Sequence, residues 1–97
     1  MKRDRNDQSL MEVLREWLSQ HPARARYEQS LIQQTWTAKM GPAIDAQTDS
    51  VQFRNGVVIV RIRSAALKQE LYMGREKILQ LLVEAHPDAG IVEVKVL

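Results

Sequence analysis

The chain has 97 residues, of which 44% are hydrophobic and 27% charged, and its net charge is +2. A chain of this length builds one hydrophobic core, and this composition is typical of a folded protein rather than a disordered one. It contains no cysteine, which excludes disulfides, thiolate metal sites and a thiol nucleophile. The net charge gives only a mild preference for polyanions, so the distribution of basic side chains matters more.

The first residues form a charged segment, residues 1–8. It is not followed by the apolar run of a signal peptide, and we expect it to be a flexible arm. No apolar run reaches the roughly 20 residues that a membrane helix needs. We therefore expect a cytoplasmic protein with no membrane contact, in which residues 9–97 form a single domain.

A first helix is predicted from Ser9, because Ser9 and Glu12 form a capping box. Apolar residues follow at helical spacing and form one stripe: Leu10, Val13, Leu14, Trp17 and Leu18. This stripe, Trp17 included, is expected to pack into the core. His21-Pro22 is expected to end the helix, since proline disfavours helical backbone in the residue before it.

A second helix is predicted from Arg24 to Met40, where Gly41-Pro42 provides a strong stop. Trp36 is expected to pack this helix on the sheet. If Trp36 were instead exposed, it would be an anchor for a protein partner, because tryptophan is enriched at interface hot spots.

A β-hairpin follows, closed by Asn55-Gly56, the preferred pair for a two-residue turn. This turn sets the register, so that Phe53 faces Val58 and Val51 faces Val60 on the core side. The opposite side of the hairpin carries Gln52, Arg54, Val57, Ile59, Arg61 and Arg63.

Ser64 is a predicted N-cap for a helical stretch that runs to Ala85. Gly74 lies on its apolar stripe, so either another backbone packs closely there or two helices meet at that point. A last strand is predicted from Ile91 to Leu97. The fold class is α+β: a two-layer sandwich with a three-stranded sheet, helices on one face, and the order α-α-β-β-α(-α)-β.

Catalytic motifs are absent from the sequence. His21 and His86 each precede a proline and are expected to be solvent-exposed turn residues, while Asp45 and Asp49 are expected in a loop. We therefore expect no enzyme activity, no cofactor and no metal site.

Basic residues give the stronger functional indication. A basic surface that includes an aromatic ring can hold phosphates and stack a base. The candidate nucleic-acid-binding residues are Arg54, Arg61, Arg63, Lys68, Tyr72, Arg75 and Lys77. Val57 and Ile59, with Ile91 and Leu97 beside them, form a candidate partner-binding patch on the same sheet face, to which an exposed Trp36 would add.

Taken in order, these motifs resemble the DciA family of bacteria. The resemblance is carried by W-x-x-x-x-G at Trp36 to Gly41, the hairpin strand Val57 to Val60, S-A-A-L-K-Q-E-L at Ser64 to Leu71, and the helix of Ile78 to Leu82. It implies a KH-like domain that acts in DNA replication by binding the replicative DNA helicase and single-stranded DNA and assisting helicase loading. The position of the KH phosphate loop then corresponds to Tyr72 to Arg75, which has one glycine, and Arg75 is expected to contact a phosphate.

Two other functions remain open from the sequence. One is a KH-like RNA-binding protein, which a comparison of RNA with DNA binding would reveal. The other is a protein-interaction module without nucleic-acid binding, which the near-neutral charge and the Val57/Ile59 patch would suit. Self-association also stays open.

Overall fold

The computed structural model describes residues 9–17 and 23–97 of the chain, and residues 9–17 are helical. The remaining elements are α2 (Ala23–Met40), α3 (Pro42–Ala46), β1 (Thr48–Arg54), β2 (Val57–Ile62), α4 (Ala65–Met73), α5 (Arg75–Ala85) and β3 (Glu93–Val96). The expected α+β layout is confirmed. Sequence reasoning missed α3, which occupies the segment expected to be a loop.

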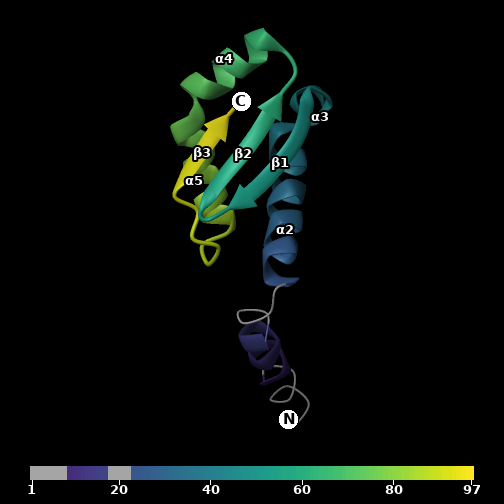
Figure 1. Ribbon diagram of the computed structural model, residues 1–97, viewed down its shortest axis with the longest axis vertical. Helices are drawn as coiled ribbons and strands as arrows, with labels where there is room; N and C mark the ends of the chain where they lie inside the picture. Colours follow the sequence, from purple (N-terminus) through teal and green to yellow (C-terminus); the bar gives the residue numbers. More distant parts are fainter. Residues whose placement is uncertain (1–8, 18–22) are drawn as a thin grey trace.

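The three strands form one mixed sheet in the order β1-β2-β3. β1 and β2 are antiparallel with the expected register, Val51 opposite Val60 and Phe53 opposite Val58. β3 runs parallel to β2, with Val94 opposite Val58 and Val96 opposite Val60. In Figure 1 the strands lie in one layer, with α5 behind β3, α2 alongside β1, and α4 across the end where β2 finishes.

One buried cluster holds these layers together. The helices contribute Ile32 and Trp36 from α2, Leu71 from α4, and Ile78 and Leu82 from α5. The sheet contributes alternate residues of one face, chiefly Val51, Val58, Val60, Ile62, Val94 and Val96. Because every one of these strand residues points to the same side, α2, α4 and α5 cover a single face of the sheet.

Ile91 corrects one expectation. It was expected with Val57 and Ile59 on the non-core face, but it is buried in the core while Val92 is 69% exposed. The backbone N–H groups of Val92 and Glu93 both donate to the carbonyl oxygen of Gly56, at 2.7 and 3.3 Å. Because Gly56 accepts from two successive residues, the alternation of side chains is interrupted just before β3. As a result, Ile91 points into the core.

Trp36 is fully buried, as expected, and its polar edge is satisfied. Its indole Nε1 donates to Thr48 Oγ1 at 3.1 Å, and that hydroxyl donates to the carbonyl oxygen of Ile44 at 2.8 Å. The relay therefore joins α2, α3 and the first residue of β1. Gly41, at φ 88°, ends α2 and lets Pro42 start α3 directly.

The hairpin turn has the backbone that its sequence predicts. Asn55 and Gly56 both have positive φ, 51° and 81°, as a type I′ turn requires. Gly56 is also crowded, because a Cβ atom there would lie 2.8 Å from the carbonyl oxygen of Gly90. The turn thus serves as a docking point for the loop that leads into β3.

Gly74 separates α4 from α5, so of its two interpretations the meeting of two helices is the correct one. Its φ is −96°, and a Cβ atom there would lie 3.6 Å from the Glu70 carbonyl oxygen and 4.0 Å from that of Leu71, both in α4. Within the described residues, no other element packs its backbone against this position. The break redirects the chain so that Leu71 and Ile78 both reach the core.

The apolar stripe of helix 9–17 was expected to pack into the core, but it is not part of it. Leu10, Val13 and Leu14 are exposed, and Trp17, which was expected in the core, is 52% exposed. The core face of the sheet is already covered by α2, α4 and α5, so it has no room for a further helix. Leu18, His21 and the segment 1–8 lie outside the described residues.

Replacing Thr48 by valine should test the buried relay. The variant keeps the shape of the side chain but leaves the Trp36 indole N–H buried without an acceptor, which costs about 1–3 kcal/mol. The urea midpoint should fall at an unchanged slope. Thr48→Ser, which keeps the hydroxyl, should recover most of the loss; equal destabilisation by both variants would contradict the relay.

Two glycine-to-alanine variants should behave in opposite ways. Gly56→Ala places a side chain at positive φ against the Gly90 carbonyl, and it should destabilise the fold by about 1–3 kcal/mol. Gly74→Ala meets ordinary contacts at an allowed φ and should be neutral or stabilising by up to about 1 kcal/mol. Thermal unfolding of both variants checks this, and a large loss at Gly74 would show an unrecognised constraint.

Candidate nucleic-acid interface

The face of the sheet away from the core is the first candidate surface, called here the open sheet face. Strand pairing decides its members, since partners in a ladder point to the same side. It consists of Ser50, Gln52 and Arg54 on β1, Val57, Ile59 and Arg61 on β2, and Glu93 and Lys95 on β3. In the described part of the chain, no helix lies over this face.

The open sheet face is more favourable to anions than the net charge of the chain suggests. Arg54, Arg61 and Lys95 are exposed, and Glu93 is the one acidic residue among the eight members. Lys95 lies opposite Ile59 in the ladder, so it extends the basic surface from β2 to β3. Cations in this arrangement can bind successive phosphates of an extended strand.

Arg63 is less available to a phosphate than these exposed cations. Its Nε and Nη2 both donate to Asp49 Oδ1, at 3.1 and 2.7 Å. Asp49 lies where the β1–β2 register shifts, between Thr48 and Ser50. The bulge therefore brings a carboxylate to Arg63 and neutralises one of the predicted phosphate contacts.

The second candidate surface is the corner between α4 and α5. The Arg75 guanidinium carbon lies 4.0 Å from the centre of the Tyr72 ring, and Arg75 Nη1 donates to the Tyr72 carbonyl oxygen at 2.9 Å. Arg75 thus caps the end of α4 and stacks on the ring. Tyr72 remains half-exposed and Lys68 is exposed one turn earlier on α4. The corner offers an aromatic surface beside two cations.

Lys77 belongs to neither surface. It lines a depression between α2 and α5 together with Lys39, Gln80, Leu81, Glu84 and Ala85. The helix break at Gly74 explains this, because Lys77 follows the break and does not continue the face of Lys68 and Tyr72. The predicted basic residues are therefore distributed over three places, of which two combine charge with an exposed flat surface.

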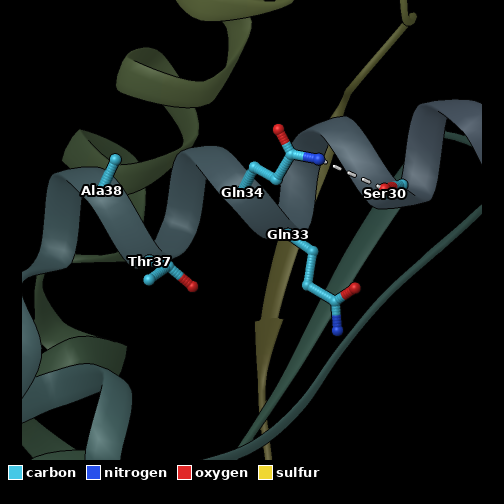
Figure 2. A pocket seen from close by; sticks show the side chains of 5 residues that line it. All are labelled: Ser30, Gln33, Gln34, Thr37 and Ala38. Carbon is cyan, nitrogen blue, oxygen red and sulfur yellow. Dashed lines mark hydrogen bonds between the residues drawn. The ribbon is translucent and has the colours of Figure 1, made fainter.

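A second depression, of about 320 Å³, lies on the outer side of α2. Figure 2 shows its lining, Ser30, Gln33, Gln34, Thr37 and Ala38, along one helix, with the Gln34 amide donating to Ser30 Oγ at 3.4 Å. Its lining contains no charged or titratable side chain. It offers neither acid–base groups nor a phosphate contact.

The residues considered for catalysis have structural partners instead. His86 was expected in solvent, but it is half-buried, and its Nε2 lies 2.6 Å from Thr35 Oγ1 on α2. Asp45 is in α3, not in a loop, and accepts from Thr37 Oγ1 at 3.0 Å. Within residues 9–17 and 23–97, no three histidine or acidic side chains are placed to hold a metal ion.

The predicted partner-binding residues differ in their exposure. Val57 and Ile59 lie side by side on the open sheet face and are partly exposed. Trp36 is fully buried, so the core alternative holds and its side chain reaches no partner. Leu97 is 45% exposed.

Sequence reasoning missed the roles of Lys95 and Asp49. Lys95 was not among the candidate nucleic-acid-binding residues, because nothing in the sequence says which strand β3 joins. Asp49 was expected in a loop, although its position opposite Arg63 follows from the bulge. The sequence carries no clear signal for the ion pair, since Asp49 lies six residues before Asn55 whereas Arg63 lies seven residues after Gly56.

Comparison with known proteins gives one match. A family model described as Dna[CI] antecedent, DciA, matches residues 9–96. No curated protein and no solved structure matches the chain. No helix among the described residues is both long enough and apolar enough to cross a membrane.

Proposed function

The chain belongs to the DciA family, which is linked to helicase loading in DNA replication, and from this we propose that it binds single-stranded DNA and the replicative DNA helicase as a non-enzymatic accessory protein. The family match covers residues 9–96, which include helix 9–17 and both candidate surfaces. The proposal therefore concerns the whole described fold rather than one motif.

The observation that supports DNA binding is the open sheet face. It places exposed Arg54, Arg61 and Lys95 around the apolar pair Val57 and Ile59. A flat surface of this kind suits a single strand, whose phosphates meet the cations while its bases lie against apolar side chains. Tyr72, with Lys68 beside it, offers a stacking position at the α4–α5 corner.

The central experiment measures fluorescence anisotropy of labelled single-stranded DNA at low and physiological salt, with and without the purified replicative helicase. Salt-sensitive DNA binding that the helicase strengthens is the expected result. Helicase binding without DNA binding would instead make the chain a protein-interaction module. Preference for RNA over DNA of the same sequence would favour the RNA-binding alternative, because the 2′-hydroxyl distinguishes the two.

Neutralising the open sheet face should weaken DNA binding. The double variant Arg54→Gln with Arg61→Gln removes two phosphate contacts, so the slope of log affinity against log salt should flatten by about 1.4 units on a single strand. The matched control, Arg26→Gln with Lys39→Gln, removes the same charge from exposed positions on α2. An equal effect of both pairs would show that only net charge matters and would reject this surface.

Removing the carboxylate that holds Arg63 should strengthen DNA binding. Asp49→Asn removes the negative charge that neutralises Arg63, and we expect affinity to rise several-fold at low salt, with a slope steeper by about 0.7 units. Stability should change little, because an exposed ion pair contributes about 0–1 kcal/mol. Asp45→Asn is the control, since it removes the same charge at a residue bonded to Thr37 instead; an identical gain there would contradict the role of Arg63.

A further inference from the structure

The corner between α4 and α5 holds an arginine that two contacts fix in place. The Arg75 guanidinium carbon lies 4.0 Å from the centre of the Tyr72 ring, and Arg75 Nη1 donates to the Tyr72 carbonyl oxygen at 2.9 Å. Arg75 is partly buried, whereas Arg54 and Arg61 on the open sheet face are exposed. A long side chain that is already held in this way loses less rotamer entropy when it binds a ligand. In Figure 1 the two helices meet at the margin of the molecule on the side of β3.

One edge of this guanidinium has no partner in the described chain. The Nε–H and one Nη2–H of an arginine point the same way, as two parallel donors of a planar group. Arg63 uses this edge for Asp49 Oδ1, at 3.1 and 2.7 Å. Among the described residues, Arg75 donates only from Nη1 and forms no ion pair. The corner therefore presents two parallel donors that are free for a ligand with two neighbouring acceptors.

The Tyr72 ring beside these donors indicates which kind of ligand fits. Two parallel donors match a phosphate, or an edge of a base that carries two neighbouring acceptors. Tyr72 is 52% exposed, and a base offers a flat face on which such a ring can stack, whereas a phosphate offers none. A base therefore uses both parts of the corner, the donors and the ring.

Guanine is the base whose chemistry matches best. Its O6 and N7 are neighbouring acceptors, whereas adenine and thymine place a donor or a methyl group beside the corresponding acceptor. Cytosine also has two neighbouring acceptors, O2 and N3, but its single ring gives less stacking surface than a purine. From these observations we propose that the α4–α5 corner binds a guanine of a single strand, with Arg75 donating to O6 and N7 and the Tyr72 ring contacting the base.

Lys68 extends the corner toward the DNA backbone. It is exposed and lies four residues before Tyr72 in α4, a spacing that places both side chains on one side of the helix. Its ammonium can therefore meet a phosphate of the strand that carries the guanine. The guanine site rests on the proposed single-stranded DNA binding and adds to it. The open sheet face holds backbone phosphates of any sequence, whereas the corner gives a preference for one base.

Binding of single strands that differ in one base tests the site. Fluorescence anisotropy with the wild-type chain compares strands of equal length that repeat the triplets TTG, TTA, TTC or TTT. We expect the TTG strand to bind at least about fivefold more tightly than the TTT strand, since one bidentate contact discriminates a base by about that much or more. The TTA and TTC strands should gain less than about twofold, because neither base combines two neighbouring acceptors with a purine face.

A modified base separates the hydrogen bonds from stacking. In 7-deazaguanine a carbon replaces N7 while the flat face is kept, so a TTG strand with this base should lose most of its gain. Hypoxanthine lacks the 2-amino group of guanine but keeps O6 and N7, so it should keep the gain. If the 7-deazaguanine strand bound as tightly as the guanine strand, Arg75 would not contact N7 and the proposal would be rejected.

The arginine itself is tested by a variant that keeps its charge. Arg75→Lys has no edge with two parallel donors, so the ratio of TTG to TTT affinity should fall below about twofold. Arg26→Lys, at an exposed position on α2, should keep the ratio of the wild-type chain. A ratio near one in the wild-type chain, a preference for TTC, or a full ratio in Arg75→Lys would each overturn the guanine site while the proposed DNA binding stands. Absence of binding to every strand would overturn both.

Discussion

The fold depends on how one buried tryptophan satisfies its polar edge. Trp36 fills the space between α2 and the sheet, and an indole N–H buried there without an acceptor would cost about 1–3 kcal/mol. Thr48 supplies the acceptor, and Ile44 in turn accepts from Thr48. This relay explains why a short helix, α3, intervenes before β1, and it fixes where β1 starts relative to α2. The relay thus places the start of β1, while the Asn55-Gly56 turn sets the register between β1 and β2 and so the membership of the open sheet face.

The distribution of charge on the finished fold matters more than its sum. A net charge of +2 says little about anion binding, yet the strand pairing gathers Arg54, Arg61 and Lys95 on a surface free of helices in the described chain. Local contacts also make two cations less available to a phosphate. Arg63 forms an ion pair with Asp49, and the Arg75 guanidinium stacks on the Tyr72 ring. Neither effect can be read from composition, because both depend on a bulge or a helix break that places two side chains in contact.

Sequence patterns predicted the local structure well and the packing partners less well. Asn55-Gly56 defined the hairpin and its register, because the turn type admits few alternatives, and Gly41-Pro42 correctly ended α2. The stripe of helix 9–17 was recognised as apolar, but an amphipathic pattern does not say what covers it, and the expected core position of Trp17 was wrong. The sequence also did not show the parallel partner of β3, which is why Lys95 was overlooked. It did not show the shared Gly56 acceptor just before β3, which is why Ile91 was assigned to the wrong side. Long-range pairing is decided by the space that other elements leave, and a single sequence does not display that space.

The parallel pairing of β2 with β3 has a consequence for synthesis of the chain. The hairpin partner β1 precedes β2, so that edge can pair within microseconds of emergence, whereas β3 arrives only after α4 and α5 have been made. At about 5–20 residues per second, the roughly 30 residues between Ile62 and Glu93 leave the other edge of β2 open for seconds. That edge belongs to Val57–Ile62, a largely apolar and β-branched stretch of the kind that pairs with strands of other chains. The nascent chain thus passes through an interval in which its most aggregation-prone strand has one unpaired edge.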